Sequence, residues 1–376
     1  MSRRKLLLVA HFGEDYIAYR SKFLSFLKER EVEVHAMVPK DKYQPEVEKQ
    51  GHPVTFYKYQ RSALAVFYFA TFYRQLKKQI KAGGFDLVYT LKFFPNLIGI
   101  MAAKAVPGVK AAGTIAGLGF LDKQDRNFLI RQIFRVYTKV LNRADYVIIQ
   151  NKDDLALLKP YLPKPKLVLT YGSGVDQSRF ENFTFDDQKD RERLKLPQRP
   201  YLLLCSRIVR EKGVKELVEG YLQAAKETRL DFDLVIAGWY DDAGLERELQ
   251  QLVEPNAAIH LLGYQSDVRY IVSIAEAVVL PSYYPEGVPR SLTESLAMRK
   301  PIITTDHKGC RETCVDGVNG FLVAPKSAKA LKEALLNYNQ LSDEAKQAMA
   351  KESRALFDQK FEQKQVFKSI VEALNL

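Results

Sequence analysis

Two cations follow an apolar run in the second half of the chain. Residues 201–206 have the pattern of a buried strand, Arg207 comes directly after them, and Lys212 precedes a helical pattern. Ligands of open parallel sheets bind at the carboxyl ends of strands, and a helix start adds backbone N–H groups and the positive end of its dipole. A guanidinium and an ammonium aimed at one point there would suit a diphosphate. The alternative is a strand end that carries two solvated cations.

Two carboxylates lie further along the chain, separated by seven residues. Glu286 falls in a loop rich in turn residues, and Glu294 falls in the helix-like stretch that follows. Ionised carboxylates accept hydrogen bonds from hydroxyls, so beside a phosphate site the pair would suit a sugar ring and a ribose. Two other interpretations are an acid/base pair of a glycosidase and an ordinary capped surface helix. A glycosidase has no need of a diphosphate site, which ranks that interpretation low.

The loop that holds Glu286 also adds positive charge. Arg290 supplies a third cation, and the backbone N–H groups of residues 288–292 would form an anion-binding nest at a helix start. We therefore expect cations and backbone donors to converge on one anionic group.

These residues need a scaffold that brings strand ends together. Short apolar runs alternate with helical patterns in both halves of the chain, which predicts parallel βαβ units and an α/β fold. The expected strands are residues 5–10, 32–38, 85–89 and 145–149, then residues 201–206, 232–237, 259–262, 277–281 and 301–305. The expected helices include residues 19–30, 63–81, 125–143 and 214–226.

The pattern restarts after a polar, charged stretch. This restart predicts two Rossmann-like, doubly wound domains that face each other across a cleft. We expect an N-terminal domain over residues 1–178, a linker over residues 179–200 and a C-terminal domain over residues 201–376. The last helix-like stretch, residues 361–376, could pack on either domain.

Composition limits the classes of protein to consider. The chain has 376 residues and is 47% apolar, which is enough for sizeable cores. Its three cysteines cannot all pair and lack zinc-site spacing, so we expect a reducing, cytoplasmic environment. We find no signal peptide and no apolar run of about 18 residues that could span a membrane. The first strand is not followed by a G-x-G-x-x-G motif, which argues against NAD binding.

Charge is unevenly distributed along the chain. The first 180 residues carry 30 Lys and Arg against 15 Asp and Glu, and the rest carry 27 against 30. A basic first half favours anionic lipid, pyrophosphate or nucleic acid as a neighbour, although a solvated basic surface would explain it equally well. No aromatic-interleaved nucleic-acid motif is present, so we expect no nucleic-acid partner.

The order and spacing of these motifs resemble the retaining family 4 glycosyltransferases, which have the GT-B fold. Glu286 and Glu294 are spaced as in the E-x7-E motif of that family, and Arg207 with residues 211–213 is similar to its S-R and K-G element. Further similar segments are residues 172–176, 280–282, 309–312 and 316–323 and, less tightly, Gly13, Lys92 and residues 117–120. The resemblance covers nearly the whole chain and points to bacterial capsule, O-antigen and N-glycan assembly enzymes.

The resemblance implies a UDP-sugar donor, with N-acetylhexosamine as the first sugar and hexose as the second. Arg207 and Lys212 would bind the diphosphate and stabilise the leaving group, without a metal ion or other cofactor. Glu286 would contact the transferred sugar, and Glu294 would hold the ribose. The other implied donor-binding residues are Gly13, Gly263, Tyr264, Gly287, Val288, Pro289, Arg290, Ser291 and Leu292.

On the acceptor side, the resemblance implies a polyprenyl-diphosphate-linked saccharide. The candidates to meet it are His11, Arg20, Lys92, Gly117 and Gly119. A lone histidine at a strand end is more often structural, so His11 has both interpretations. Leu91 stands where many members of the family carry a histidine.

Residues 125–143 have the pattern of an amphipathic helix. One arc carries Arg131, Arg135, Lys139 and Arg143, and we expect the opposite arc, which includes Leu129, Val136 and Tyr137, to pack on the sheet. The basic arc would face water or rest on anionic lipid. Residues 63–81 are a second candidate for membrane contact. We therefore expect a peripheral protein on the inner face of the cytoplasmic membrane.

Two other functions remain open. A sugar-nucleotide epimerase could use the same fold, but it would need an acid/base set that the sequence does not reveal. A non-catalytic, basic membrane-binding module would explain the charge, but not the donor-site motifs.

Overall fold

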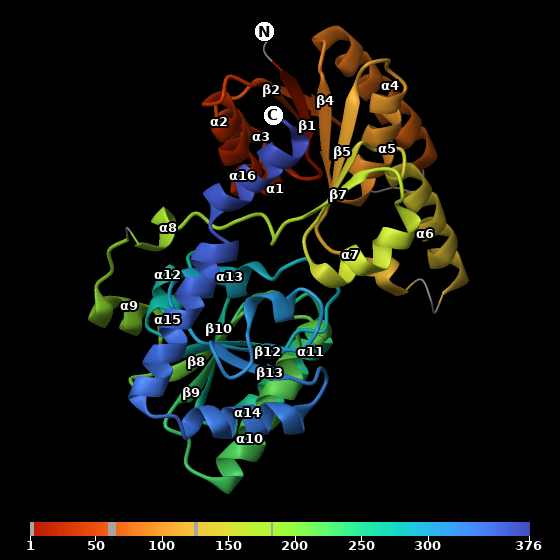
Figure 1. Cartoon of the computed structure of the whole chain (residues 1–376). Coiled ribbons are helices and arrows are strands. Elements are labelled where there is room, and N and C mark those ends of the chain that lie inside the picture. The colour runs from red at the N-terminus through yellow and green to blue at the C-terminus, as the bar shows by residue number, and fades with distance from the viewer. Residues whose placement is uncertain (1–3, 59–64, 124–126, 182) are drawn as a thin grey trace. The chain divides into compact units, whose positions relative to one another are not determined.

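The computed structural model describes residues 4–58, 65–123, 127–181 and 183–376. Each half of the chain builds its own parallel sheet, and the chain divides into two units (Figure 1). The first unit consists of Met1–Gly174 and Lys364–Leu376, and the second consists of Val175–Gln363. The predicted α/β class with two doubly wound sheets is confirmed.

A seven-stranded sheet lies at the centre of the first unit, in the order β3-β2-β1-β4-β5-β6-β7. All of its strand pairs are parallel. The strand order reverses at β1, and ligands of such folds bind outside the carboxyl ends of strands at this switch point. The strands are β1 (Lys5–Val9), β2 (Glu33–Pro39), β3 (Val54–Tyr57), β4 (Leu87–Leu91), β5 (Lys110–Ile115), β6 (Tyr146–Ile149) and β7 (Lys166–Leu169).

Helices cover both faces of this sheet. Successive strand residues point to opposite faces, so Leu7 and Val9 join the core under α4, α5, α6 and α7. Leu6 and Leu8 join the core under η1, α2, α3 and α16. The helices are α1 (Gly13–Asp15), η1 (Tyr16–Arg20), α2 (Ser21–Lys28), α3 (Gln44–Glu48), α4 (Ala65–Gly83), α5 (Phe93–Lys104), η2 (Gly119–Lys123), α6 (Phe128–Leu141), α7 (Lys152–Leu158), η3 (Lys159–Tyr161) and α16 (Gln363–Leu374).

The last helix, α16, completes the core of the first unit. The ring of Phe367 is buried, 5.1 Å from the ring of Phe23 and 5.5 Å from that of Phe26. Ile370 and Leu374 are buried in the same cluster. Of the two packing positions that the sequence allowed, the chain therefore uses the one on the first unit.

A six-stranded sheet forms the second unit, in the order β10-β9-β8-β11-β12-β13. All of its pairs are parallel as well. The strands are β8 (Tyr201–Cys205), β9 (Asp233–Ala237), β10 (Ile259–Gly263), β11 (Ala277–Leu280), β12 (Ile302–Thr305) and β13 (Gly320–Val323). The helices are α8 (Ser178–Glu181), α9 (Asp187–Leu194), η4 (Arg210–Lys212), α10 (Val214–Glu227), α11 (Ala243–Val253), α12 (Arg269–Ser273), α13 (Arg290–Ala297), η5 (Cys310–Thr313), α14 (Ala328–Asn339) and α15 (Asp343–Lys360).

Some boundaries differ from those expected. Residues 179–200, expected as a linker, belong to the second unit and contain α9. The start of α9 is attached to the second unit by Tyr270. The Tyr270 hydroxyl donates to the backbone carbonyl and the carboxylate of Asp187, each at 2.9 Å. The helix expected over residues 19–30 begins earlier, as α1, η1 and α2 in succession, and the strand expected over residues 85–89 lies at Leu87–Leu91.

Two glycines let the loops at the carboxyl edge of the second sheet approach one another. Gly213 joins η4 to α10 with φ +72°, and a Cβ atom there would lie 2.3 Å from the carbonyl oxygen of Pro281. Gly309 has φ +76°, and a Cβ atom there would lie 2.0 Å from the carbonyl oxygen of Gly287. Any larger residue would push the loop after β11 away from its neighbours.

We expect Gly309→Ala to lower the free energy of unfolding more than Gly317→Ala does. Gly317 has a similar φ of +72° but open space where a Cβ would be, so its replacement costs only the backbone strain of about 1–2 kcal/mol. Gly309→Ala adds a clash with backbone to a positive φ that is also strained for alanine. Urea denaturation of both variants measures the difference, and equal losses would show that the Gly309 contact does not constrain the loop.

Candidate active site

The ammonium of Lys212 lies at the centre of the candidate site in the second unit. The residue is only 8% exposed, and its Nζ lies 2.5 Å from Oε1 of Glu286. The Ser282 hydroxyl donates to the same carboxylate oxygen at 3.2 Å. This ion pair joins the loop after β8 to the loop after β11, two strands that are paired in the sheet. Two of the predicted catalytic residues are thus in direct contact.

The loop that carries Glu286 is held by hydrogen bonds on several sides. The backbone N–H of Tyr283 donates to the carbonyl of Glu211 at 2.8 Å, and the Thr305 hydroxyl donates to the carbonyl of Ser282. The Cys310 thiol donates to the same carbonyl at 3.7 Å. Burial, and then the nearby charge of Glu286, raise the pKa of this thiol to about 11. The carboxylate of Glu286 is therefore positioned by a supported loop.

Arg207 reaches the site from the end of β8. Its guanidinium pairs with Asp241 at 3.0 Å, and the Trp239 indole N–H donates to the other oxygen of that carboxylate at 3.2 Å. The ring of Tyr284 lies 5.7 Å from the guanidinium of Arg207 and 5.8 Å from the ammonium of Lys212, within the range of cation–π attraction. The structure thus brings together the two cations predicted to bind a diphosphate.

The second predicted glutamate lies one helical turn after the start of α13. The Nε of Arg290 donates to Oε1 of Glu294, so the third predicted cation is also paired with a carboxylate. Burial raises the pKa of the Cys205 thiol to about 12, and the charge of Glu294 adds to this shift, which places Glu294 near the end of β8.

The start of α13 lies between these two glutamates. Its N-cap residue is Pro289, which makes no side-chain hydrogen bond to the helix. The first turn of α13, with Ser291 and Leu292, therefore begins without a side-chain cap, as several other helices of the chain do. Gly287 and Val288 precede this turn, in the loop against which Gly309 packs.

Each of the three cations is thus matched with one carboxylate. A diphosphate that binds here would exchange its own oxygens for those of Asp241, Glu286 or Glu294. The sequence interpretation missed Asp241, although it follows β9, the strand beside β8, and strand ends of one parallel sheet meet at the same edge.

Two exposed aromatic rings lie beside Asp241. Trp239 is 49% exposed and Tyr264 is 64% exposed, and their ring centroids are 5.7 Å apart in an edge-to-face arrangement. Tyr264 follows Gly263, whose φ is +66° and whose carbonyl accepts the backbone N–H of Gly238 at 2.8 Å. Exposed ring faces of this kind can stack on a planar base, which suits the predicted role of Tyr264.

Gly13 and His11 lie in the first unit, after β1. The backbone N–H of Gly13 donates to the Asp41 carboxylate at 2.9 Å, and a Cβ at Gly13 would lie 2.6 Å from the other oxygen. A side chain at this position would crowd the Asp41 carboxylate, and the approach of Gly13 to a diphosphate stays a prediction. His11 is buried against Phe12 and Phe94, with ring centroids 4.0 and 5.7 Å away.

The other acceptor candidates lie near loops of the same unit. Lys92 has φ +68° and pairs with Asp15 at 2.5 Å. The guanidinium of Arg20 is buried and donates to the Ser173 hydroxyl at 3.3 Å. Gly117 and Gly119 both have positive φ and flank the buried Leu118 after β5. Lys92 and these glycines follow β4 and β5, at the carboxyl edge of the first sheet, and their contact with an acceptor stays a prediction.

The helix α6 presents an outer face that differs from the expected one. Tyr137 points inward, and its hydroxyl accepts a hydrogen bond from the buried Asn96 amide at 2.9 Å. Leu129 and Val136, expected to pack on the sheet, are exposed at 67% and 55%. They sit on the solvent side with Arg131, Arg135 and Lys139. The apolar residues of the second candidate helix, α4, instead contribute to the core through Phe72 and Leu76.

Within the described ranges, no group of three or more His, Cys, Asp or Glu side chains is arranged to hold a metal ion.

Two family models match the chain in sequence. The model described as "Glycosyl transferases group 1" matches residues 186–356, and the model described as "Glycosyl transferase 4-like" matches residues 5–151. The first match contains Arg207, Lys212, Glu286 and Glu294, and the second contains the acceptor candidates of the first unit.

Two bacterial glycosyltransferases have similar sequences over most of the chain. The N,N'-diacetylbacillosaminyl-diphospho-undecaprenol alpha-1,3-N-acetylgalactosaminyltransferase of Campylobacter jejuni is 26% identical over 334 residues, covering 87% of each chain. The putative glycosyltransferase EpsD of Bacillus subtilis is 27% identical over 330 residues, covering 85% of this chain and 83% of EpsD.

Solved structures share the fold over nearly the whole chain. A glycosyltransferase from Rickettsia africae superposes with a TM-score of 0.81 at 20% identity, covering 99% of this chain and 98% of that one. HepE of Anabaena in complex with UDP superposes with a TM-score of 0.79 at 18% identity, covering 99% of each chain. The chain therefore belongs to the glycosyltransferases of the family 4 type, and its fold is GT-B.

Proposed function

We propose that the chain transfers a sugar from a UDP-sugar to a polyprenyl-diphosphate-linked saccharide, with retention of the anomeric configuration. The observation that carries the proposal is the set of cation–carboxylate pairs centred on Lys212 and Glu286. The similar Campylobacter jejuni enzyme is named for transfer of N-acetylgalactosamine to an undecaprenyl-diphosphate-linked sugar, which supports a lipid-linked acceptor and N-acetylhexosamine as the first donor sugar. A hexose is the second donor sugar that we propose. HepE, similar in fold, binds UDP, which supports a uridine nucleotide.

Charge on the leaving group is the basis of the proposed mechanism. Cleavage of the anomeric bond leaves negative charge on the diphosphate, and fixed cations there lower the barrier. Arg207 and Lys212 are already oriented by Asp241 and Glu286, so the diphosphate replaces anionic partners that held the cations in place. Once Lys212 binds phosphate, Glu286 can accept hydrogen bonds from sugar hydroxyls. Metal ions are not required in this proposal because the side chains supply the charge.

Retention places the acceptor on the same face of the sugar as the leaving group. The acceptor hydroxyl then gives its proton to the leaving phosphate oxygen while the new glycosidic bond forms. In this proposal Glu286 and Glu294 position the sugar and the ribose, and neither acts as an acid.

We expect UDP, but neither GDP nor NAD, to raise the melting temperature of the protein. Arg207→Ala should abolish this shift and lower kcat/KM by a factor of about 100 to 1000, because such a donor contributes about 3–4 kcal/mol to the transition state. Arg210→Ala is a matched control, since Arg210 pairs with Glu248 at 2.9 Å outside the site. Similar losses in both variants, or a response to NAD alone, would contradict the assignment.

We expect replacement of Glu294 and replacement of Glu286 to have different effects. Glu294→Ala should weaken UDP binding in calorimetry, because the ribose loses its hydrogen-bond acceptor. Glu286→Ala should mainly lower turnover in an assay with UDP-sugar, while UDP still binds. Glu219→Ala on α10 is the control, because the half-buried Glu219 lies near Lys215 on the same helix and is not one of the predicted site residues. Unchanged turnover in Glu286→Ala would refute its contact with the transferred sugar.

We also infer that α6 rests on an anionic membrane surface. Its outer face combines the basic residues Arg131, Arg135 and Lys139 with exposed Phe128 and Leu129, a pattern of helices that lie in the lipid interface. Among the described helices, none is long and apolar enough to cross a bilayer. The proposed membrane contact therefore rests on this face, at the basic first half of the chain.

The double variant Arg135→Ala/Lys139→Ala should bind vesicles that contain phosphatidylglycerol less tightly. Each cation near an anionic surface contributes about 1 kcal/mol, so we expect roughly fivefold weaker binding per charge in a sedimentation assay. Lys28→Ala/Lys49→Ala removes two exposed charges from α2 and the end of α3 and is the control. Equal weakening in both would mean that net charge, not α6, causes binding.

A further inference from the structure

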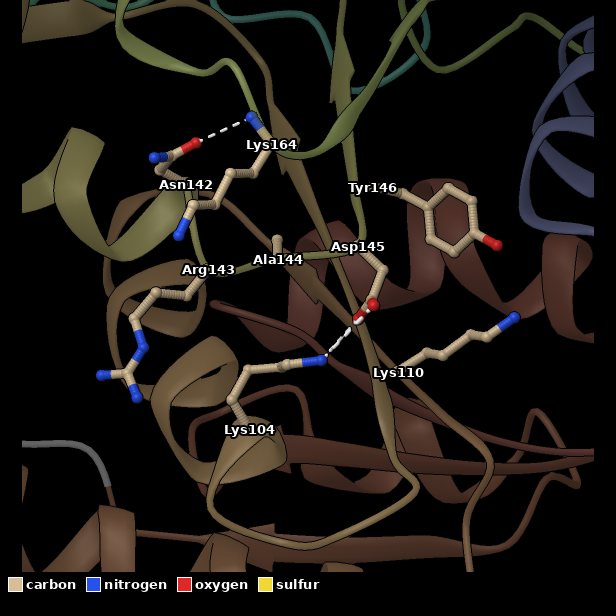
Figure 2. Close-up of a pocket in the computed structure, with 8 residues that line it drawn as sticks. All are labelled: Lys104, Lys110, Asn142, Arg143, Ala144, Asp145, Tyr146 and Lys164. Atoms are coloured by element: carbon tan, nitrogen blue, oxygen red, sulfur yellow. Dashed lines mark hydrogen bonds and ion pairs between the residues drawn. The ribbon is translucent and has the colours of Figure 1, made fainter.

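A pocket of about 560 Å³ opens in the first unit, away from the sheet edge that carries the acceptor candidates. It is lined by Lys104 at the end of α5, Lys110 at the start of β5, Arg143 just after α6 and Lys164 just before β7 (Figure 2). Since β5, β6 and β7 all begin here, the pocket lies at the amino-terminal edge of the sheet. Ligands of the transferase site belong at the opposite edge.

The pocket has an excess of positive charge. Four of the side chains that line it are cations, and Asp145 is its one carboxylate. Asp145 is already engaged, because its oxygens accept from the Lys104 ammonium at 3.0 and 3.3 Å and from the backbone N–H of Ala111 at 2.7 Å. In the view of Figure 2, Lys164 and Arg143 lie on one side of this pair and Lys110 on the other.

The dipoles of the neighbouring helices offset only part of this positive charge. The carboxyl ends of α5 and α6 point to this edge, and each carries roughly half a negative charge. Together they offset about one of the four cations, and Asp145 offsets another. Among the described residues, the side chains of Lys110, Arg143 and Lys164 make no ion pair. The pocket therefore keeps an excess of about two positive charges, the charge of one bound phosphate group.

We propose that this pocket is a second ligand site, which binds a phosphate-bearing group and is separate from the transferase site. Cations from four different elements surround a cavity large enough for such a group, and Lys and Arg side chains are the usual partners of phosphate oxygens. The inference is independent of the donor and acceptor proposed above, because none of these residues belongs to that site.

Two sources could supply the phosphate group. Arg143 also continues the basic outer face of α6, so the headgroup of an anionic lipid could enter the pocket while α6 lies on the membrane. A free phosphorylated compound offers the same oxygens in solution. The two sources share their chemistry and differ in whether a bilayer is needed.

The test compares Lys110→Ala/Lys164→Ala with Lys28→Ala/Lys49→Ala, which removes the same charge elsewhere in the first unit. Inorganic pyrophosphate is titrated into each full chain by calorimetry, and sedimentation measures binding to phosphatidylcholine vesicles with and without phosphatidylglycerol. Both lysines of the pocket variant are exposed, so we expect it to fold, as its melting temperature will show. Arg207→Ala serves as a further control, because pyrophosphate can also bind at Arg207 and Lys212.

We expect the pocket variant to bind pyrophosphate or the phosphatidylglycerol vesicles about tenfold more weakly than the control, since charged hydrogen bonds are lost. Weakening for pyrophosphate indicates a free phosphate compound, and weakening for vesicles alone indicates a lipid headgroup. The proposal is overturned if the pocket variant and the control bind both probes equally. If Arg207→Ala removes all pyrophosphate binding, the free phosphate compound is excluded, and equal vesicle binding by the pocket variant and the control then overturns the proposal. Loss of UDP binding or turnover would bear only on the transferase site.

Discussion

The ion pair between Lys212 and Glu286 is the contact on which the rest of the second-unit site depends. A largely buried ammonium is costly unless an anion faces it, and the partner comes from a loop after a different strand. The two loops can meet only because glycines at 213 and 309 leave room for neighbouring carbonyl oxygens. Ser282 then fixes the carboxylate by its hydroxyl, and its own carbonyl is held by Thr305. The charge pair thus links two loops that backbone hydrogen bonds and close glycine contacts also hold together.

Cation–carboxylate pairs of the same kind stabilise the positive charges of the site in the absence of a ligand. Arg207 and Lys212 lie 5.7 and 5.8 Å from the same Tyr284 ring and would repel one another, yet each of them, like Arg290, has a carboxylate within hydrogen-bonding distance. An entering diphosphate therefore meets cations whose positions are already set, which reduces the reorganisation that binding requires. The carboxylates it displaces come to lie beside the sugar and ribose. In the proposed function, the groups that balance the charge in the free protein become the groups that hold the donor.

Much of this architecture was predictable from sequence, and the failures have physical causes. Apolar alternation and turn residues revealed both sheets and the edge that holds Arg207 and Lys212. The strand β5 was missed because it is made of small residues, which are needed where the Asn96 side chain packs 3.2 Å from the position of a Cβ at Gly113. The partner Asp241 follows another strand, and only sheet order brings it to Arg207. The inward face of α6 was predicted too wide: Tyr137 is buried as expected, whereas Leu129 and Val136, at the margin of that face, are exposed.

The position of α16 has a consequence for the order in which the protein folds during synthesis. The first unit receives its last helix only after the whole second unit, about 190 residues, has been translated. At about 5–20 residues per second this takes roughly 10–40 s. Throughout that time Phe23 and Leu24 lack the cover that Phe367 and Ile370 provide in the finished molecule. The nascent first unit therefore keeps an open apolar surface on the ribosome, and the second unit can be the first to complete its core.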